Sequence, residues 1–319
     1  MKIISLFSGC GGLDLGLIKS GHSVVWANDI FAKAVATYRA NIGDHILEDD
    51  ITNVKVEEIP DADIVVGGFP CQGFSIANMN RNIDDPRNKL YRQFLRVLRG
   101  KKPSFFLAEN VKGILSLEGG EVFQRILREF EKCGYSVRYA LINSADYGLP
   151  QTRHRVFVFG IRHDLKIEVP FPPPTTHAKN ADVCPGKLPW VSVGKALAGL
   201  PEPGSATPLK NHVCSTYKIK NNGYINHRPV DPNKPAPTVT ARGDTKGGAM
   251  INHHPSNTRR MSVRETAIIQ GFPNSFEFVG SMTDCYMQIG NAVPPIVGFN
   301  MGKVLTLAEQ QLSDFLVKR

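Results

Sequence analysis

One cysteine and one glutamate stand where they could act together on a bound molecule. Cys71 lies in the stretch 67–72, directly after the apolar run 63–66. This run predicts an interior strand of a parallel sheet, whose ligands bind beyond the carboxyl ends of the strands. Glu109 directly follows another apolar run, 104–108. The two side chains could be a nucleophile and a proton donor, although a single cysteine after a strand is more often a small buried apolar side chain.

The surroundings expected for Glu109 would help it to donate a proton. Apolar walls disfavour a carboxylate, so they would raise the pKa of this side chain. Before the next predicted strand, alternation puts Gln151, Arg153 and Arg155 on one face. Three polar groups that face one way suit a polar ligand better than a core. His154, on the other face, is expected to be structural.

A glycine-rich turn at residues 8–12 joins the first predicted strand to a helix over 13–20. Such a turn lets a ligand reach backbone N–H groups at the start of the helix. It is compatible with a dinucleotide site, but Asp14 stands where the usual motif has its third glycine. The turn alone therefore leaves the ligand open.

Acidic positions downstream favour a nucleoside. Asp29 ends the second predicted strand, about where an acid holds ribose hydroxyls, although it could equally cap the helix predicted over 32–40. Asp50 and Ile51 precede the strand at 63–66. There a carboxylate could accept a hydrogen bond from an adenine amino group while the isoleucine packs on the ring.

A long polar loop follows the cysteine. Residues 72–88 are rich in asparagine, and a loop of this length within a compact α/β unit is often an active-site lid. The next predicted helix, over 88–100, has one apolar face. Arg92, Arg96 and Arg99 line its other face and are expected to be solvated rather than to contact a nucleic acid.

The charge of the chain indicates a polyanionic partner. It carries a net charge of +9 over 319 residues, with a pI near 9.2. Between residues 205 and 264 there are ten Lys or Arg residues and two acidic ones, in a loop-rich segment that follows a stiff, Pro-rich linker at 170–174. A basic, loop-rich module beside a ligand crevice suits nucleic-acid binding, although charge alone does not prove it.

Cysteine use and hydropathy exclude several classes of protein. The six cysteines contain no C-x-x-C pair, which argues against a zinc ribbon and a disulfide framework, and no metal site is expected. A reducing cytoplasm fits best. The chain begins like a signal peptide, but the turn at 8–12 interrupts the apolar run. No later stretch is long and apolar enough to span a membrane.

The order of the elements predicts an α/β fold. Strands alternate with helices up to about Gly160 and form a mainly parallel sheet. The length predicts one large domain and a smaller one. Ser262 and Glu265 predict a capped helix over 263–270. A long apolar helix that ends near residue 316 is expected to pack back on the first domain.

Taken in order, these motifs resemble those of the DNA cytosine-5 methyltransferases, in particular the bacterial enzymes of restriction-modification systems. The matches occur in the family's order and span nearly the whole chain. They are 7–12, Asp29, 50–51, 69–72, 109–111, 151–155, 237–240 with 264–265, and 288–291.

The resemblance implies a fold and a cofactor. It implies a doubly wound, Rossmann-like methyltransferase sheet in a catalytic domain of residues 1–174 and 288–319, with a smaller, loop-rich target-recognition domain at 175–287. It also implies S-adenosylmethionine in the glycine-rich crevice, which accounts for the absent third glycine. The residues that would surround this cofactor are Phe7, Gly9, Gly11, Gly12, Leu13, Asp29, Ile30, Asp50, Ile51, Pro70, Leu90 and Asn291.

The resemblance also implies roles in a reaction. Cys71 would add to C6 of a cytosine rotated out of the duplex, and the loop 72–88 would close over it. Glu109 would protonate N3 of the base, while Arg155 with Arg153 would hold it. Candidate contacts to DNA are Ser75, Arg81, Thr238 and Arg242.

The implied partner is double-stranded DNA, bound by a monomer in a bacterial cytoplasm. A cognate restriction endonuclease could act on the same site without a stable complex. Two alternatives remain. A tRNA-modifying branch shares the Cys71 and Glu109 motifs, so cytosine-5 methylation of tRNA is one. The other is a nucleic-acid-binding protein on a relic catalytic fold, against which the presence of both residues argues.

Overall fold

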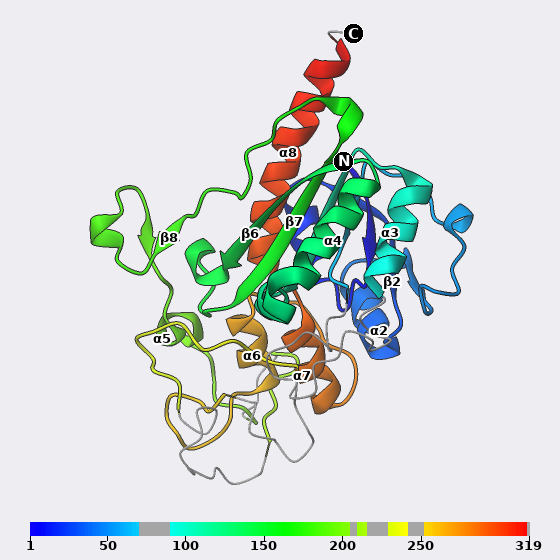
Figure 1. Cartoon of the computed structure of the whole chain (residues 1–319). Helices are drawn as coiled ribbons and strands as arrows, with labels where there is room; N and C mark the ends of the chain where they lie inside the picture. Colours follow the sequence, from blue (N-terminus) through cyan, green and yellow to red (C-terminus); the bar gives the residue numbers. More distant parts are fainter. Residues whose placement is uncertain (70–89, 205–208, 216–228, 242–251, 318–319) are drawn as a thin grey trace.

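The computed structural model describes residues 1–69, 90–204, 209–215, 229–241 and 252–317 (Figure 1). Its centre is a seven-stranded sheet. In the order in which they lie side by side, the strands are β3 (Ile46–Glu48), β2 (Ser23–Asp29), β1 (Lys2–Leu6), β4 (Ile64–Gly67), β5 (Phe105–Val111), β7 (His154–Arg162) and β6 (Tyr135–Asn143). The first five are parallel, and β7 runs antiparallel to both of its neighbours. A separate pair is formed by β8 (His177–Ala178) and β9 (Leu188–Pro189).

Helices cover both faces of the sheet. The helices α1 (Gly12–Lys19), α2 (Ala32–Asn41) and α8 (Pro295–Val317) contribute apolar side chains to the core on one face. The core on the other face is completed by α3 (Leu90–Lys101) and α4 (Glu121–Lys132). The predicted doubly wound α/β sheet is therefore confirmed. Short 3-10 helices occur at η1 (Val56–Glu58), η3 (Lys112–Gly120), η4 (Ser144–Tyr147), η5 (His163–Leu165) and η6 (Ala181–Val183).

Three further helices lie beyond one end of the sheet. They are α5 (Val193–Leu197), α6 (Val263–Ile269) and α7 (Met282–Asn291), and Figure 1 shows them at the end of the molecule opposite the C-terminus. Their apolar side chains share a core of their own, which also includes Cys10 of the glycine-rich turn. This core therefore touches the sheet at the turn that follows β1. No helix in the described ranges has both the length and the hydropathy of a membrane span.

Two local expectations can be compared directly with the structure. The capping box of α6 is confirmed, because Ser262 Oγ accepts from Glu265 N at 3.0 Å and Glu265 Oε2 accepts from Ser262 N at 2.7 Å. The predicted strand that ends in residues 109–111 is confirmed as well. β5 continues to Val111, because Glu109 and the next two residues pair with the start of β7. Glu109 is therefore fixed within a strand, where its backbone is held by a ladder.

The C-terminal helix packs back on the first half of the chain, as predicted. A Cβ added to Gly16 of α1 would lie 2.2 Å from Pro295 O, and one added to Gly298 of α8 would lie 2.5 Å from Leu13 O. Real Cβ atoms do not approach main-chain oxygens so closely. Glycine is therefore required on both helices for their backbones to meet.

We expect Gly298→Ala to lower the free energy of unfolding by about 1–3 kcal/mol, because the added methyl group would force α1 and α8 apart. Urea unfolding followed by circular dichroism measures this change. Gln310→Ala, on the exposed side of α8, is the control and should change the free energy by less than about 0.5 kcal/mol. Equal effects of the two substitutions would show that the helices tolerate the extra volume.

Candidate active site at the carboxyl ends of the central strands

An ion pair joins Glu109 to Arg155 at the end of the sheet where the parallel strands finish. Glu109 is near the end of β5, and Arg155 is near the start of the antiparallel neighbour β7. Arg155 Nε lies 3.0 Å from Glu109 Oε1, and the two side chains are 16% and 12% exposed. The guanidinium also donates from Nη1 to His154 O at 2.8 Å. The carboxyl is therefore held in one orientation and is nearly removed from water.

The protonation of Glu109 is set by two opposing effects. Burial raises its pKa, while the positive charges of Arg155 and Arg153 lower it. Burial is the larger effect, so the pKa of this carboxyl stands above its ordinary value. This agrees with the expectation from the sequence. A carboxyl group that keeps its proton closer to neutral pH is suited to proton donation.

Glu109 and Asn110 contact the chain that leads to Cys71. A Cβ added to Gly68 would lie 2.8 Å from Glu109 Oε2, so the carboxyl lies directly against this glycine. Asn110 Nδ2 donates to Phe69 O at 3.3 Å. Pro70 and Cys71 themselves lie outside the described residues. The predicted pairing of a thiol with this carboxyl therefore stays a prediction.

Arg153 has a different environment from the one expected. Its side chain is fully buried, and its terminal nitrogens donate to main-chain carbonyls of three residues. These are Val239 O at 2.8 Å, Gly290 O at 2.9 Å and Ala292 O at 3.1 Å. The prediction of an open arginine that holds a base needs correction here, because these donors are used within the protein. We therefore treat Arg153 as a positioning residue.

Gln151 also faces the interior rather than a ligand. Its amide nitrogen donates to Ile269 O at 3.2 Å and to Gln270 Oε1 at 2.7 Å, while its amide oxygen accepts from Val239 N at 2.9 Å. The expectation that Gln151, Arg153 and Arg155 form one ligand-facing row is thus wrong for the first two. Both connect the segment before β7 to the helices beyond the sheet.

The glycine-rich turn after β1 adopts the backbone conformation that its glycines allow. Gly9 and Gly11 have φ values of +56° and +87°. A Cβ at Gly9 would meet nothing within 4 Å, so the backbone is open there. A Cβ at Gly12 would lie 2.3 Å from Val293 O, so this glycine lets α1 begin against the start of the C-terminal segment. The turn therefore offers its open side to a ligand at Gly9.

Asp29 binds this turn from the end of β2. Its Oδ2 accepts from Gly9 N at 2.7 Å, and its Oδ1 accepts from Phe31 N at 2.9 Å, just before α2. Burial raises the pKa of Asp29, although these backbone N–H groups act against the shift. Both interpretations of the sequence keep support, because the carboxylate bonds the start of α2 and also lies beside the turn.

An apolar surface accompanies this carboxylate. Ile30 is 68% exposed, whereas Ile51 is 3% exposed. Arg96 donates to Ile51 O at 2.7 Å and to Val54 O at 2.9 Å. The expectation that Arg96 is only solvated is therefore wrong, since it fixes the loop that carries Asp50 and Ile51. A carboxylate, an open backbone turn and an exposed isoleucine fit a ligand with sugar hydroxyls and an aromatic ring.

The other predicted cofactor residues lie near these elements or mark their ends. Phe7, with φ of +56°, directly follows β1 and packs on the core. Leu13 is 7% exposed at the start of α1, and Leu90 begins α3. Asn291 is exposed at the end of α7, between the two carbonyls of residues 290 and 292 that Arg153 binds.

The predicted DNA contacts are mostly outside the described residues. Ser75, Arg81 and Arg242 all fall there, as does the proposed lid at 72–88. Thr238 is described, and its hydroxyl donates to Thr152 O at 2.8 Å. This bond places Thr238 beside the segment that leads into β7, on the same stretch of chain as the Arg153 acceptor Val239.

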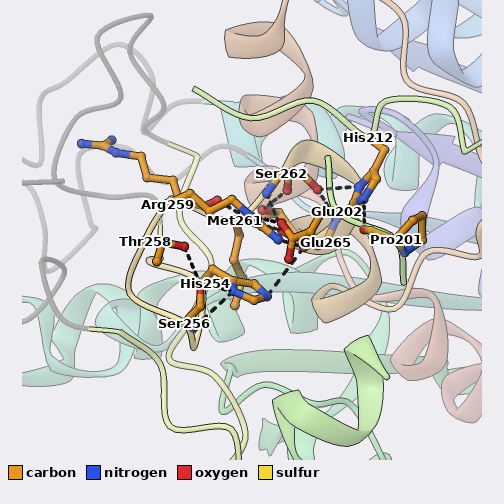
Figure 2. Close-up of polar contacts among 12 residues, drawn as sticks. Pro201, Glu202, His212, His254, Ser256, Thr258, Arg259, Met261, Ser262 and Glu265 are labelled. Carbon is orange, nitrogen blue, oxygen red and sulfur yellow. Dashed lines mark hydrogen bonds and ion pairs between the residues drawn. The ribbon is translucent and has the colours of Figure 1, made fainter. Parts of the chain in front are cut away.

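A polar cluster around the buried Glu265 holds the loops next to α6 (Figure 2). Arg259 donates to the two oxygens of Glu265 at 2.8 and 2.7 Å and to Glu202 at 2.8 Å. Burial disfavours the charge of Glu265, but the bonds from Arg259 and from Ser262 N hold its pKa below the ordinary value. His254 Nε2 lies 3.8 Å from the same carboxylate. The cluster therefore joins Glu202 and the segment 254–259 to the helix α6.

Comparison with known proteins gives consistent matches along the chain. The family description C-5 cytosine-specific DNA methylase matches residues 1–306. The type II methyltransferase M.NgoFVII of Neisseria gonorrhoeae is 39% identical over 92% of this chain and 83% of that protein. M.NgoPII of the same organism is 36% identical over 96% of this chain and 95% of its own length. The crystal structure of a protein described as a DNA modification methyltransferase encoded within a prophage (E. coli) has a TM-score of 0.75 at 25% identity, covering 97% of this chain and 99% of that one.

The bonds of Arg153 predict that even a conservative substitution is harmful. Arg153→Lys keeps the charge, but one ammonium group cannot reproduce the planar set of donors, so at least one buried carbonyl would lose its partner. We expect the free energy of unfolding to fall by about 1–3 kcal/mol, measured by urea denaturation. Arg138→Lys, at an arginine of β6 that is 49% exposed, is the matched control. A similar small effect of both substitutions would contradict the positioning role.

Proposed function

The chain belongs to the family of C-5 cytosine-specific DNA methylases, and on this premise we propose how its own residues carry out the reaction. The enzyme transfers a methyl group from S-adenosylmethionine to C5 of cytosine in DNA. The observation that carries the assignment of its active site is the Glu109–Arg155 pair. Its carboxyl lies against Gly68, three residues before Cys71 in the sequence.

The crevice after β1 and β2 fits the methyl donor, which supplies a methyl group made electrophilic by a positively charged sulfur. Asp29 would bind the ribose hydroxyls, because each of its oxygens accepts one backbone bond and keeps capacity for another. Ile30 and Ile51 would cover the adenine, and Asp50 would accept from its amino group. The open turn at Gly9 would face the methionine part, with Phe7, Gly11, Gly12, Leu13, Pro70, Leu90 and Asn291 completing the pocket.

Cys71 and Glu109 would together activate the base. C5 of cytosine is a poor nucleophile until the ring is converted to an enamine. The thiolate of Cys71 would form a bond to C6 while Glu109 gives its proton to N3. The electron pair that reaches C5 would then bond the methyl group as the methyl–sulfur bond breaks and leaves a neutral sulfide. Loss of the C5 proton to a base then expels the thiolate, and N3 returns its proton to Glu109. The ring is aromatic again and carries the methyl group.

Arg155 would orient the acid and help to hold the base. One of its N–H groups is used by Glu109 and one by His154 O, so others are left to donate to a carbonyl of cytosine. Its positive charge also favours a thiolate near the carboxyl. Arg153 contributes indirectly, since it holds the backbone around Asn291 and Val239.

We assign the target-recognition domain to residues 175–287, with the catalytic domain formed by 1–174 and 288–319. The ten basic residues between 205 and 264 suit the phosphates of double-stranded DNA. The target cytosine must leave the stack to reach Glu109, at a cost of about a few kcal/mol. Contacts from Ser75, Arg81, Thr238 and Arg242 would offset part of this cost.

The biological role proposed is the protection of host DNA in a restriction-modification system. The support comes from relatives that are named type II methyltransferases. We propose a monomer that acts in the bacterial cytoplasm, with a cognate endonuclease that reads the same short site without a stable complex. Methylation of tRNA is not favoured, because the family that matches is defined by DNA methylation.

The substrate and the nucleophile can be tested together. With a labelled methyl donor, label should enter duplex DNA and not tRNA, and bisulfite sequencing of DNA from expressing cells should give one short methylated site. Cys71→Ser should lower the rate by at least about a thousandfold, because a hydroxyl is a far weaker nucleophile. Cys133→Ser, at the end of α4, is the control. Label in tRNA alone would overturn the substrate, and an active Cys71→Ser protein would overturn the nucleophile.

The raised pKa of Glu109 predicts a particular pH profile. The proton needed at N3 is present below the folded pKa and is lost as pH rises through it, so the single-turnover rate should fall on the alkaline side. Glu109→Gln should lower the rate by about 10²–10⁴-fold, remove that alkaline fall and leave cofactor binding intact. Glu131→Gln, on an exposed position of α4, should behave as wild type. Unchanged turnover in Glu109→Gln would remove the acid from the mechanism.

A further inference from the structure

Asp14 is a fully buried carboxylate beneath the glycine-rich turn, and the reaction proposed above does not use it. It lies in the first turn of α1 and is 0% exposed. Its Oδ1 accepts from Ser5 Oγ of β1 at 2.7 Å, and its Oδ2 accepts from Tyr38 OH of α2 at 2.9 Å. Three elements around the cofactor crevice therefore converge on one carboxylate.

The same cluster supports the turn from below. A Cβ added to Gly11 would lie 2.9 Å from Cδ2 of Tyr38, so the tyrosine ring packs directly under this glycine. Tyr38 OH also lies 3.1 Å from His45 Nε2, and His45 is only half-buried. With the tyrosine donating to Asp14, the histidine nitrogen must donate to the tyrosine. This series of hydrogen bonds gives the buried carboxylate a route to exchange a proton with solvent.

Among the described residues, no positively charged group acts on the pKa of Asp14. Burial raises its pKa to about 6, and the two groups that act against the shift, Ser5 and Tyr38, are neutral hydroxyls. The other titratable groups at the cluster are His45 and Cys10. The charge that acts on the pKa of His45 is the negative one of Asp44. The pKa of the Cys10 thiol is raised by burial and further by Asp29 and Asp14. The negative fields of both carboxylates therefore reach the turn itself.

Hydrogen bonding alone does not explain this residue. An asparagine side chain could accept the same two hydroxyl bonds through its oxygen, without the cost of burying a charge. A carboxylate is useful only where its charge is used. A ligand that brings a positive charge to the turn would make the otherwise unfavourable buried anion favourable.

We propose that Asp14 is a positioning residue whose charge makes the crevice prefer the positively charged sulfonium of the methyl donor to the neutral sulfide of the product. This inference rests on the proposed cofactor site. S-adenosylmethionine and S-adenosylhomocysteine share the adenine, the ribose and the amino-acid group, so contacts such as that of Asp29 with the ribose act on both. They differ by one methyl group and one positive charge, and the field of Asp14 acts on that difference.

The preference also serves turnover. After methyl transfer the sulfur is neutral, and the attraction between the turn and the ligand is lost at that moment. The product is then held more weakly than the donor, which favours exchange of the product for new donor.

The sulfur need not touch Asp14, because a charge in a buried, apolar surrounding acts over a longer distance than one in water.

The proposal is tested by the ratio of two dissociation constants, measured by calorimetry for S-adenosylmethionine and S-adenosylhomocysteine. In Asp14→Asn the preference for the donor at about pH 7.5 should fall about tenfold, mainly through weaker binding of the donor. In wild type the preference should fall as pH is lowered through about 6, where Asp14 takes up its proton. In Asp14→Asn it should be nearly independent of pH between about 5 and 7.

Two further variants separate the charge from the fold. Asp61→Asn removes an 89% exposed acid at the far end of the sheet and should leave the ratio unchanged. Tyr38→Phe keeps the carboxylate but removes a donor that lowers its pKa, so the fall of the ratio should move to higher pH. In thermal unfolding, Asp14→Asn should gain stability relative to wild type as pH rises from about 5 to 7.5, since only wild type then buries a charge.

The outcomes distinguish this inference from the function on which it rests. A ratio in Asp14→Asn within about twofold of wild type, with both ligands still bound, would overturn the role of Asp14 and leave the cofactor site intact. Equal weakening of both ligands would likewise show a structural role only. If wild type bound neither molecule, the proposed cofactor site would fall together with the inference.

Discussion

The direction of one strand brings Glu109 and Arg155 together. β7 is antiparallel to β5, so the first residues of β7 lie beside the last residues of β5. This brings Arg155 within 3.0 Å of Glu109 at the edge where the parallel strands end. A parallel strand in the same place would begin at the opposite edge, and its first side chains would be a strand length away. The ion pair between Glu109 and Arg155 thus depends on a single reversed strand in an otherwise parallel sheet.

The same reversal connects the catalytic edge to the rest of the molecule. The residues just before β7 emerge at that edge, and there Gln151 and Arg153 bind carbonyl and amide groups from residues 239, 269–270 and 290–292. Buried polar groups of this kind must be paired, so their partners cannot shift without a large cost. The helices beyond the sheet are therefore placed relative to Glu109 by the strand that carries Arg155.

The sequence predicts the parts of this arrangement that depend on local pattern. Apolar, β-branched runs indicate the strands, glycines indicate the turn after β1, and the positions of Asp29 and Glu109 follow from where those strands end. Long polar side chains are different. Arg96 lies on the polar face of α3, yet its stem carries the guanidinium to Ile51 O and Val54 O. No local pattern distinguishes such an arginine from a solvated one, because its acceptors come from distant parts of the chain.

The direction of β7 is equally hidden, since parallel and antiparallel strands buried on both faces have the same apolar composition. The covering of a face is also not a local property. Alternation shows that Gln151 and Arg153 share a face, but it does not show whether a ligand or the protein itself covers that face. The correct prediction of a raised pKa for Glu109 had a different basis. It needed only an apolar strand around the carboxyl, and the strand itself supplies that.

Asp14 is fully buried and Glu109 and Asp29 are partly buried, and these three carboxyl groups differ in the charge of their hydrogen-bond partners. Glu109 has a guanidinium within 3.0 Å, Asp29 has two backbone N–H groups, and Asp14 has two hydroxyls. In all three the pKa is raised by burial, so each opposes folding when it is ionised. A protein built only for stability would have neutral groups there. In the proposed reaction, Glu109 would face a base that accepts its proton, Asp29 would face the ribose hydroxyls, and Asp14 would act on a positively charged sulfur.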